Sequence, residues 1–259
     1  MSVLYDEEEE KKYLFVKRVD CTNCQRQFND IRVLNSKLRR KESDQDLRPR
    51  FQFIDSLKYG VTACPFCGYS APIKSFDHLT SLQQKRLREK VTSQFMPRED
   101  SNDTILDYAT AITQHELALV CAISMEQPVS EQGYLYLQLA WLLRGRIEEA
   151  QAEQGLATPE LMQQLKDKEE RYYKQAYDLL SQAATQENFP ICGMDSNTFD
   201  YLLAVMSFRF KEYDLATRYC GSIVQTRGVS AKLKDKALML KDDIIAAKKA
   251  EEEAGSVSE

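Results

Sequence analysis

The sequence predicts an α+β fold that is mostly α, with a small β module ahead of a helical domain. Two observations predict it. Both C-x2-C cysteine pairs lie in the first 78 residues, each just after a short strand-like run. After residue 79 glycine and proline become sparse, and apolar residues recur at the three- and four-residue steps of one helix face. We therefore expect a module over residues 1–78, a helical domain over 79–250 and a flexible acidic tail over 251–259.

Composition narrows the class of protein. The 259 residues are 43% hydrophobic and 29% charged, enough for a buried core, and the net charge of −5 does not favour nucleic-acid binding by the whole chain. No apolar run approaches the ~20 residues of a membrane helix, and the N-terminus MSVLYDEEEEKK lacks the pattern of a secretory signal. We expect a cytoplasmic protein, and in a reducing compartment its cysteines do not form a disulfide framework.

Local patterns place the elements in order. Residues 13–19 (YLFVKRV) and 57–63 (LKYGVTA) predict short strands. Thr158–Pro159–Glu160 predicts a helix start, because a hydroxyl can cap free N–H groups, proline suits the first position and an acid suits the positive end of the helix dipole. The full set of expected helices is 81–95, which Pro97 ends, 104–125, 131–146, 159–185, 197–210, 212–226 and 230–248, with the last eleven residues frayed.

The helical half shows a loose internal repetition. Ala204 and Ala216 stand twelve positions apart, with Tyr213 three before the second, and Ala140 and Ala176 form a looser copy. Small residues at such positions let antiparallel helices pack closely, as in tetratricopeptide pairs. We expect tetratricopeptide-like pairs and no regular array, with an irregular helical bundle as the alternative.

The cysteine pairs are the strongest chemical signal. Cys21 and Cys24 precede Cys64 and Cys67, with 39 residues between the two pairs. A tetrahedral zinc ion takes four thiolates, and each C-x2-C turn supplies two. In CPFCG, Pro65 stiffens the turn and Gly68 can adopt a left-handed conformation, whereas Gln25 holds the equivalent place in the first turn. The pattern predicts a zinc-ribbon-like module that holds one structural Zn²⁺ per chain, with iron as the other metal that four thiolates suit.

Neighbouring residues qualify this site. Four bases flank the first pair and can offset a thiolate charge of −2, namely Lys17, Arg18, Arg26 and Arg32. His78 is expected at the surface or in a cap, and His115 in the core. The remaining cysteines, Cys121, Cys192 and Cys220, are expected as small buried apolar residues. CPFC also occurs in glutaredoxin-like redox sites, but those open a helix, which Gly68 and Pro72 prevent here.

The insert between the pairs is basic. Residues 25–63 hold nine Lys or Arg and five acids, a net charge of +4, and the densest stretch is SKLRRK at 36–41. With Phe51, Phe53 and Tyr59 after it, the insert could grip a phosphate backbone and stack bases. Candidate contacts to an anion or nucleic acid are Lys37, Arg39, Arg40 and Lys41. The alternative is a solvated loop balanced by the acids at 6–10 and by the thiolates.

Three stretches, YLFVKRVDCTNCQRQF, SKLRRKESDQDLRP and LKYGVTACPFCGYSA, together resemble a family of bacterial cytoplasmic proteins known as domain of unknown function 2225. The resemblance covers most of the chain and is most specific in the first 75 residues. It implies Cys21, Cys24, Cys64 and Cys67 as metal ligands, and it departs from the family at CTNC, where a proline is usual. The family carries no established activity, so the resemblance implies architecture alone.

No nucleophile–base pair, phosphate loop or pair of catalytic carboxylates stands at a telling spacing, so we do not expect an enzyme. We expect a scaffold or adaptor that binds a protein partner through its helices or its ribbon. The alternative is a nucleic-acid-binding regulator that uses the basic insert, and a weaker one is a thiol redox protein.

Overall fold

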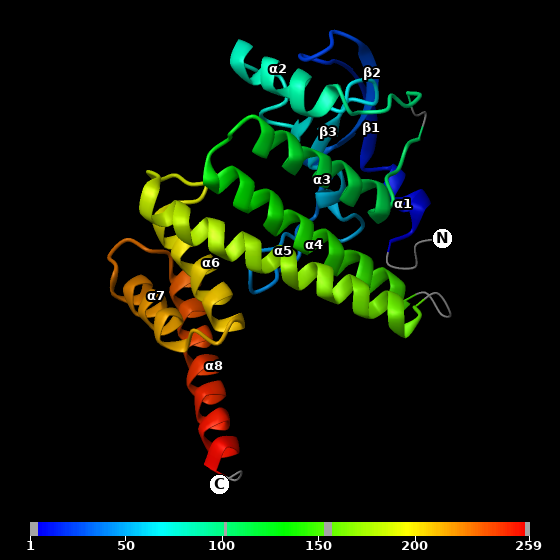
Figure 1. The fold of residues 1–259 in the computed structure, drawn as a ribbon. Helices are drawn as coiled ribbons and strands as arrows, with labels where there is room; N and C mark the ends of the chain where they lie inside the picture. The colour runs from blue at the N-terminus through cyan, green and yellow to red at the C-terminus, as the bar shows by residue number, and fades with distance from the viewer. Residues whose placement is uncertain (1–4, 101–102, 153–156, 257–259) are drawn as a thin grey trace. The chain divides into compact units, whose positions relative to one another are not determined.

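The computed structural model describes residues 5–100, 103–152 and 157–256, with side chains described to Glu253 (Figure 1). Packing divides it into two compact units. The first contains the chain up to Ser43 and from Arg48 to Ala176, and the second contains Asp44–Leu47 and the chain from Tyr177 onward. The expected boundary after residue 78, between the metal-binding module and the helical domain, stays a prediction.

The first unit begins with short elements. A five-residue helix precedes two small antiparallel hairpins, β1 with β2 and β3 with β4, and the register runs Leu14↔Val33 to Asp20↔Gln27 and Val61↔Pro72 to Ala63↔Ser70. The elements are α1 (Glu7–Lys11), β1 (Leu14–Asp20), β2 (Gln27–Val33), η1 (Asn35–Lys37), η2 (Ser56–Tyr59), β3 (Val61–Ala63) and β4 (Ser70–Pro72).

Helices complete both units. The remaining elements are α2 (Ser81–Leu87), η3 (Arg88–Thr92), α3 (Tyr108–Ser124), α4 (Val129–Ala152), α5 (Pro159–Gln186), α6 (Ser196–Arg209), α7 (Tyr213–Gln225) and α8 (Ala231–Ser256). The protein is therefore mostly helical after its N-terminal hairpins, as predicted. None of the helices in the described ranges is long and apolar enough to cross a membrane.

Side chains cap the helix starts, at Asp107 before α3 and, as predicted, at Thr158 before α5. Asp107 accepts the N–H of Thr110 at 2.7 Å at the start of α3, and Thr158 accepts the N–H of Leu161 at 3.2 Å at the start of α5. Each cap satisfies an N–H group that the helix itself leaves without a partner.

Several elements differ from expectation: α3 begins at Tyr108, four residues after its predicted start, and α4 extends to Ala152, six residues beyond its predicted end. Residues 57–59 form a 3₁₀ turn, because Asp55 accepts the N–H of Leu57 at 3.1 Å, so only Val61–Ala63 is strand. The helix from Ser81 turns into a π-helical stretch and ends at Thr92, well before Pro97. Helix α8 runs to Ser256, through most of the segment expected to be a frayed, flexible tail; its alanine and glutamate residues favour helix. Residues 257–259 lie outside the described residues.

The second unit has its own core. Tyr201 and Ala204 of α6, Ala216 and Cys220 of α7 and Leu240 of α8 are buried in one cluster, and Leu47 packs against it. Ala204 and Ala216 have no exposed surface, which fits the predicted role of small residues at the α6–α7 contact. Ala140 and Ala176 are also fully buried.

Candidate metal centre

The first cysteine pair occupies the turn of the β1–β2 hairpin. The N–H of Cys21 donates to the carbonyl of Arg26 at 3.0 Å, and the N–H of Gln25 returns to the carbonyl of Cys21 at 2.8 Å. Gln25 takes a positive φ of 64°, the left-handed conformation that closes the turn. The expected need for a left-handed residue here is thus met by glutamine in place of glycine.

The second pair repeats this path in the turn of the β3–β4 hairpin. The N–H of Cys64 donates to the carbonyl of Tyr69 at 2.8 Å, and the N–H of Gly68 donates to the carbonyl of Cys64 at 3.2 Å. Gly68 has a φ of 75°, as the sequence predicted. Both turns therefore have one backbone design, and we call them knuckle 1 (residues 21–26) and knuckle 2 (residues 64–69).

The two knuckles bring four sulfurs together. All four Sγ atoms lie within 4.8 Å of one another. The Sγ atoms of Cys21 and Cys67 are 3.6 Å apart, and those of Cys24 and Cys64 are 3.7 Å apart. Four sulfurs bound at ~2.3 Å to one tetrahedral ion stand ~3.8 Å from each other. The cluster therefore has the donor set and the spacing to hold a metal ion, and the predicted ligands are the residues brought together.

Burial protects the cluster. Cys21, Cys64 and Cys67 are at most 2% exposed, and Cys24 is half-buried. The surrounding apolar core takes Phe28 from β2, and also side chains of the segments that follow, namely Tyr69, Phe76, Leu87, Val91, Cys121 and Met125. The rings of Tyr69 and Phe76 stack with centroids 4.7 Å apart. Since α2, η3 and α3 all contribute to this core, the cluster connects the hairpins to the first helices.

Polar contacts favour a thiolate at Cys67, while the pKa values of Cys21 and Cys64 are raised. Asn23, which is 2% exposed, directs its Nδ2 to the Sγ of Cys67 at 3.4 Å and to the Oγ1 of Thr92 at 3.0 Å. Hydrogen bonds from Cys21, from Cys64 and from Asn23 lower the pKa of Cys67. The contacts that Cys21 makes with Cys64 and Cys67 raise the pKa of Cys21. One thiolate is thus stabilised at Cys67, which is the ionised form that a metal requires.

Comparison with known proteins agrees with this architecture. Residues 14–244 match the model of a family described as an uncharacterized protein conserved in bacteria, DUF2225. The chain belongs to this family. No curated protein and no solved structure matches it.

The bases beside knuckle 1 of this DUF2225 protein make other contacts than expected. The guanidinium of Arg26 lies 4.7 Å from the centre of the Phe66 ring and so joins knuckle 1 to knuckle 2. Arg18 donates to Gln27, and Arg32 pairs with Asp30. The side-chain amide that reaches a sulfur comes from Asn23, which the sequence analysis missed because an asparagine in a C-x2-C turn carries no pattern of its own.

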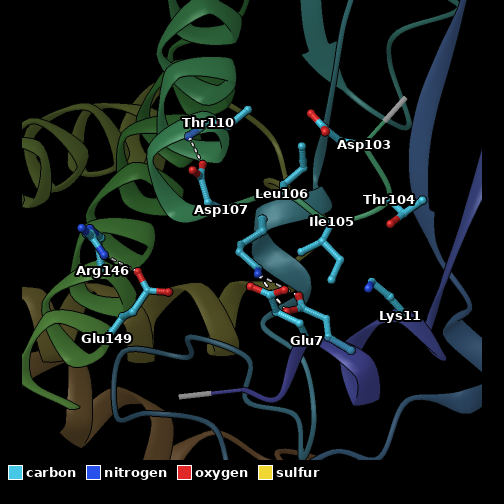
Figure 2. A pocket seen from close by; sticks show the side chains of 12 residues that line it. Glu7, Lys11, Asp103, Thr104, Ile105, Leu106, Asp107, Thr110, Arg146 and Glu149 are labelled. Carbon is cyan, nitrogen blue, oxygen red and sulfur yellow. Dashed lines mark hydrogen bonds and ion pairs between the residues drawn. The ribbon is translucent and has the colours of Figure 1, made fainter. Parts of the chain in front are cut away.

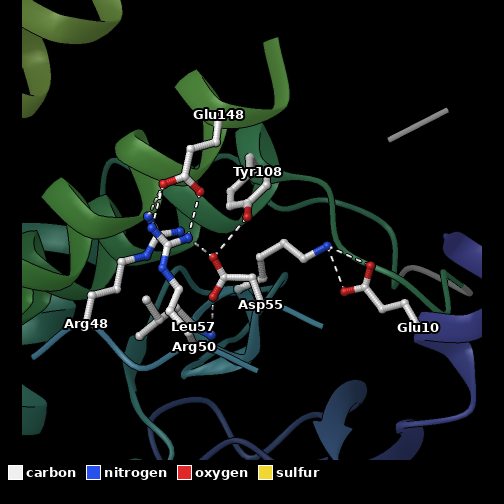
Figure 3. A network of polar contacts seen from close by, with 8 residues as sticks. Glu10, Arg48, Arg50, Asp55, Leu57, Tyr108 and Glu148 are labelled. Carbon is white, nitrogen blue, oxygen red and sulfur yellow. Dashed lines mark hydrogen bonds and ion pairs between the residues drawn. The ribbon is translucent and has the colours of Figure 1, made fainter. Parts of the chain in front are cut away.

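The basic insert divides into a buried part and an exposed part. Figure 3 shows Arg48 and Arg50 converging on Glu148, and Arg48 also meets Asp55 at 2.9 Å. Tyr108 donates to the same Asp55 at 2.9 Å. These ion pairs neutralise positive charge that was counted toward a basic surface in the sequence. The four predicted anion contacts, Lys37, Arg39, Arg40 and Lys41, are all exposed.

Two aromatic residues of the insert are not available for stacking. Phe51 is 7% exposed and Tyr59 is 1% exposed, and both belong to a small core with Ile54. Phe53 stacks on Tyr13, with ring centroids 5.8 Å apart. These aromatic side chains are therefore packed within the DUF2225 fold, while the exposed lysines and arginines remain at its surface.

The histidines and remaining cysteines lie outside the ligand set. His78 is exposed, and His115 is fully buried with its Nδ1 2.8 Å from the carbonyl of Ala111. Burial lowers the pKa of His115 to about 4, so the ring is neutral. Cys121 and Cys220 are buried as predicted, and Cys192 is half-buried.

Proposed function

We propose that the four thiolates bind one zinc ion per chain and that this ion has a structural role. The support is the tetrahedral spacing of Cys21, Cys24, Cys64 and Cys67, with Sγ–Sγ distances of 3.6 and 3.7 Å joining one knuckle to the other. A redox C-x2-C pair works through the two sulfurs of one turn, so this arrangement makes a thiol redox role the weakest candidate. Four protein ligands fill a tetrahedral site and leave no position for activating water.

The protein is therefore, in our proposal, a non-enzymatic cytoplasmic scaffold or adaptor for a protein partner. A buried, closed metal cluster offers no access to a substrate, and most of the chain is packed helix. Helical pairs and ribbons commonly present surfaces to other proteins. The ion then holds the hairpins against α2 and α3 so that the binding surface keeps one shape.

Two measurements test the proposal in sequence. Native mass spectrometry of the purified chain should give one zinc per chain, and a strong chelator should unfold the hairpin region, seen as faster hydrogen exchange in residues 14–72. Cross-linking of a co-purified partner should then map to the helices or to the hairpins. A metal-free chain with ordered hairpins would remove the structural-zinc claim, and co-purification of nucleic acid with no protein partner would remove the adaptor claim.

A nucleic-acid-binding regulator is the second candidate. The observation that favours it is the exposure of Lys37, Arg39, Arg40 and Lys41 in one short stretch. Such contacts weaken steeply with salt, because they release counterions from the phosphate backbone. Changing Arg39, Arg40 and Lys41 to glutamate should abolish any salt-sensitive binding of nucleic acid and leave zinc content unchanged. Binding that survives this change would rule this candidate out.

A further inference from the structure

The first unit contains a cavity of about 540 Å³, away from the cysteine cluster (Figure 2). Its walls come from α1, from the residues before α3 and from the C-terminal half of α4. Small-molecule sites in proteins usually measure ~300–1,000 Å³. The lining residues are Glu7, Glu10, Lys11, Lys58, Asp103, Thr104, Ile105, Leu106, Asp107, Thr110, Arg146 and Glu149.

Three of the charged lining residues are buried. Glu10 is 1% exposed, Lys58 is 4% exposed and Glu149 is 7% exposed. The Nζ of Lys58 lies 2.8 Å from one oxygen of Glu10, and the hydroxyl of Tyr59 donates to that same oxygen at 2.8 Å. A buried ion pair contributes little net stability, because desolvation offsets its attraction. The pair is already satisfied within the wall, so a ligand in the cavity is expected to contact another buried group.

Glu149 is the group placed to contact that ligand. One of its oxygens is paired with Arg146. In Figure 2 the other oxygen points away from Arg146 and into the cavity. A carboxylate held by an arginine and buried on its other sides is a fixed acceptor, which recognises a donor with little loss of side-chain entropy.

The charge of the lining indicates the sign of the ligand. Five carboxylates and three cationic side chains give the cavity a net charge of −2. Glu10 with Lys58 and Glu149 with Arg146 are neutral pairs, so the excess comes from the rim. A small ligand with two or more positive charges would match it.

A metal ion fits this cavity poorly. In the described ranges, Cys21, Cys24, Cys64 and Cys67 form the one group of three or more cysteine, histidine or carboxylate residues whose ligand atoms converge. The acids around the cavity are spread over its walls, and a hard cation requires several oxygens at ~2.0–2.6 Å from one point. An elongated organic cation can reach separate carboxylates where a point charge cannot.

We propose that this cavity binds a short aliphatic polyamine, with one ammonium group on Glu149 and another at the acidic rim near Glu7 and Asp107. Glu7 is exposed on the rim, and Asp107 uses one oxygen to cap Thr110. The site is independent of the metal centre and of the proposed adaptor role.

Calorimetry on the full, metal-loaded chain tests the proposal, with spermidine as the probe at low ionic strength. Wild type should bind one spermidine saturably. Glu149→Gln keeps the shape of the side chain but removes its charge, and should weaken binding by about ten-fold or more. Glu42→Gln, an exposed acid outside the lining, is the matched control and should leave the affinity unchanged.

A variant that is expected to bind more tightly shows that changes in affinity do not come from misfolding. Lys11 is exposed on the rim, and Lys11→Glu makes the cavity more acidic without touching its buried groups. This variant should bind spermidine several-fold more tightly than wild type. The proposal is overturned if spermidine does not saturate wild type at millimolar concentration, if Glu149→Gln and Glu42→Gln weaken binding equally, or if Mg²⁺ alone saturates the site and displaces the amine.

Discussion

Knuckle 1 and knuckle 2 reach one backbone geometry from different sequences, CTNCQR and CPFCGY. In each, the residue after the second cysteine takes a positive φ, 64° at Gln25 and 75° at Gly68. Glycine adopts this conformation freely, while another L-residue in it carries about 1–2 kcal/mol of strain. Both turns must direct two sulfurs at one point, and this requirement determines their backbone conformation. In knuckle 1 the conformation is kept at the cost of strain at Gln25.

The surroundings of the two turns differ as well. A Cβ on Gly68 would lie 2.5 Å from the ring of Phe95, so knuckle 2 requires glycine for space as well as for conformation. Knuckle 1 contributes Asn23, whose amide reaches across to Cys67 of knuckle 2. Knuckle 2 is thus constrained by packing and knuckle 1 by polar contacts, and substitutions should affect them in different ways.

Loss of one cysteine sulfur should have the largest effect on metal content and stability, and the effect should differ between knuckle 1 and knuckle 2. Cys24→Ser and Cys67→Ser should each lose bound metal and destabilise the hairpins by several kcal/mol, since metal binding and folding are coupled at such sites. The Cys67 variant should be the more damaging, because Cys67 is 2% exposed and its sulfur accepts from Asn23. Metal analysis and denaturant unfolding measure both quantities.

Cys192→Ser is the control, because this half-buried cysteine lies outside the cluster and its variant should keep full metal content. Equal metal content in all three variants would contradict the four-sulfur site.

Crowding at knuckle 2 should give the next largest effect. Gly68→Ala combines an unfavourable φ with the clash on Phe95 and should destabilise by about 3 kcal/mol. Gly228→Ala provides the comparison, because its φ is 84° but nothing lies within 4 Å of the added atom. It should destabilise by only ~1 kcal/mol in denaturant titrations.

Adding Phe95→Ala tests the cause, since removing the ring should recover part of the loss from Gly68→Ala. If the two alanine variants are equally stable, packing does not distinguish the knuckles.

The polar contact of knuckle 1 should affect the metal more than the fold. Asn23→Ala removes the hydrogen bond to Cys67 and should lower metal affinity by about 10–100-fold. Competition with a chromogenic chelator measures this. Asn35→Ala, at an exposed asparagine of η1, should have no effect. An unchanged affinity in Asn23→Ala would mean that the amide only packs, through Thr92, and does not stabilise the thiolate.

These differences define what the sequence could predict. The C-x2-C spacing predicted which four cysteines converge in the fold, because two cysteine pairs at that spacing are typical of one metal site. The helix start at Thr158 could be predicted because a cap is a local contact. Features that depend only on residues close together in the sequence could therefore be predicted.

Contacts between distant residues could not be predicted. Arg48 and Arg50 were assigned to a basic surface because their partner Glu148 lies about 100 residues away in α4. The sulfur contact of Asn23 also depends on knuckle 2, 44 residues further along the chain. Charge counted along the sequence therefore overestimated the basic surface of the insert, since the chain cannot reveal which charges meet in the fold.

The smallest predicted effect has the opposite sign. Gln25→Gly should stabilise the protein by ~0.5 kcal/mol, because the relief of left-handed strain exceeds the loss of one exposed bond from Gln25 to the carbonyl of Thr22 and the extra freedom of glycine in the unfolded chain. Gln27→Gly, in the extended backbone of β2, should destabilise by about the same amount. Denaturant midpoints at saturating zinc measure both. A loss of stability in Gln25→Gly would show that the glutamine side chain contributes more to knuckle 1 than its conformation takes away, and the two knuckles would then differ in design as well as in sequence.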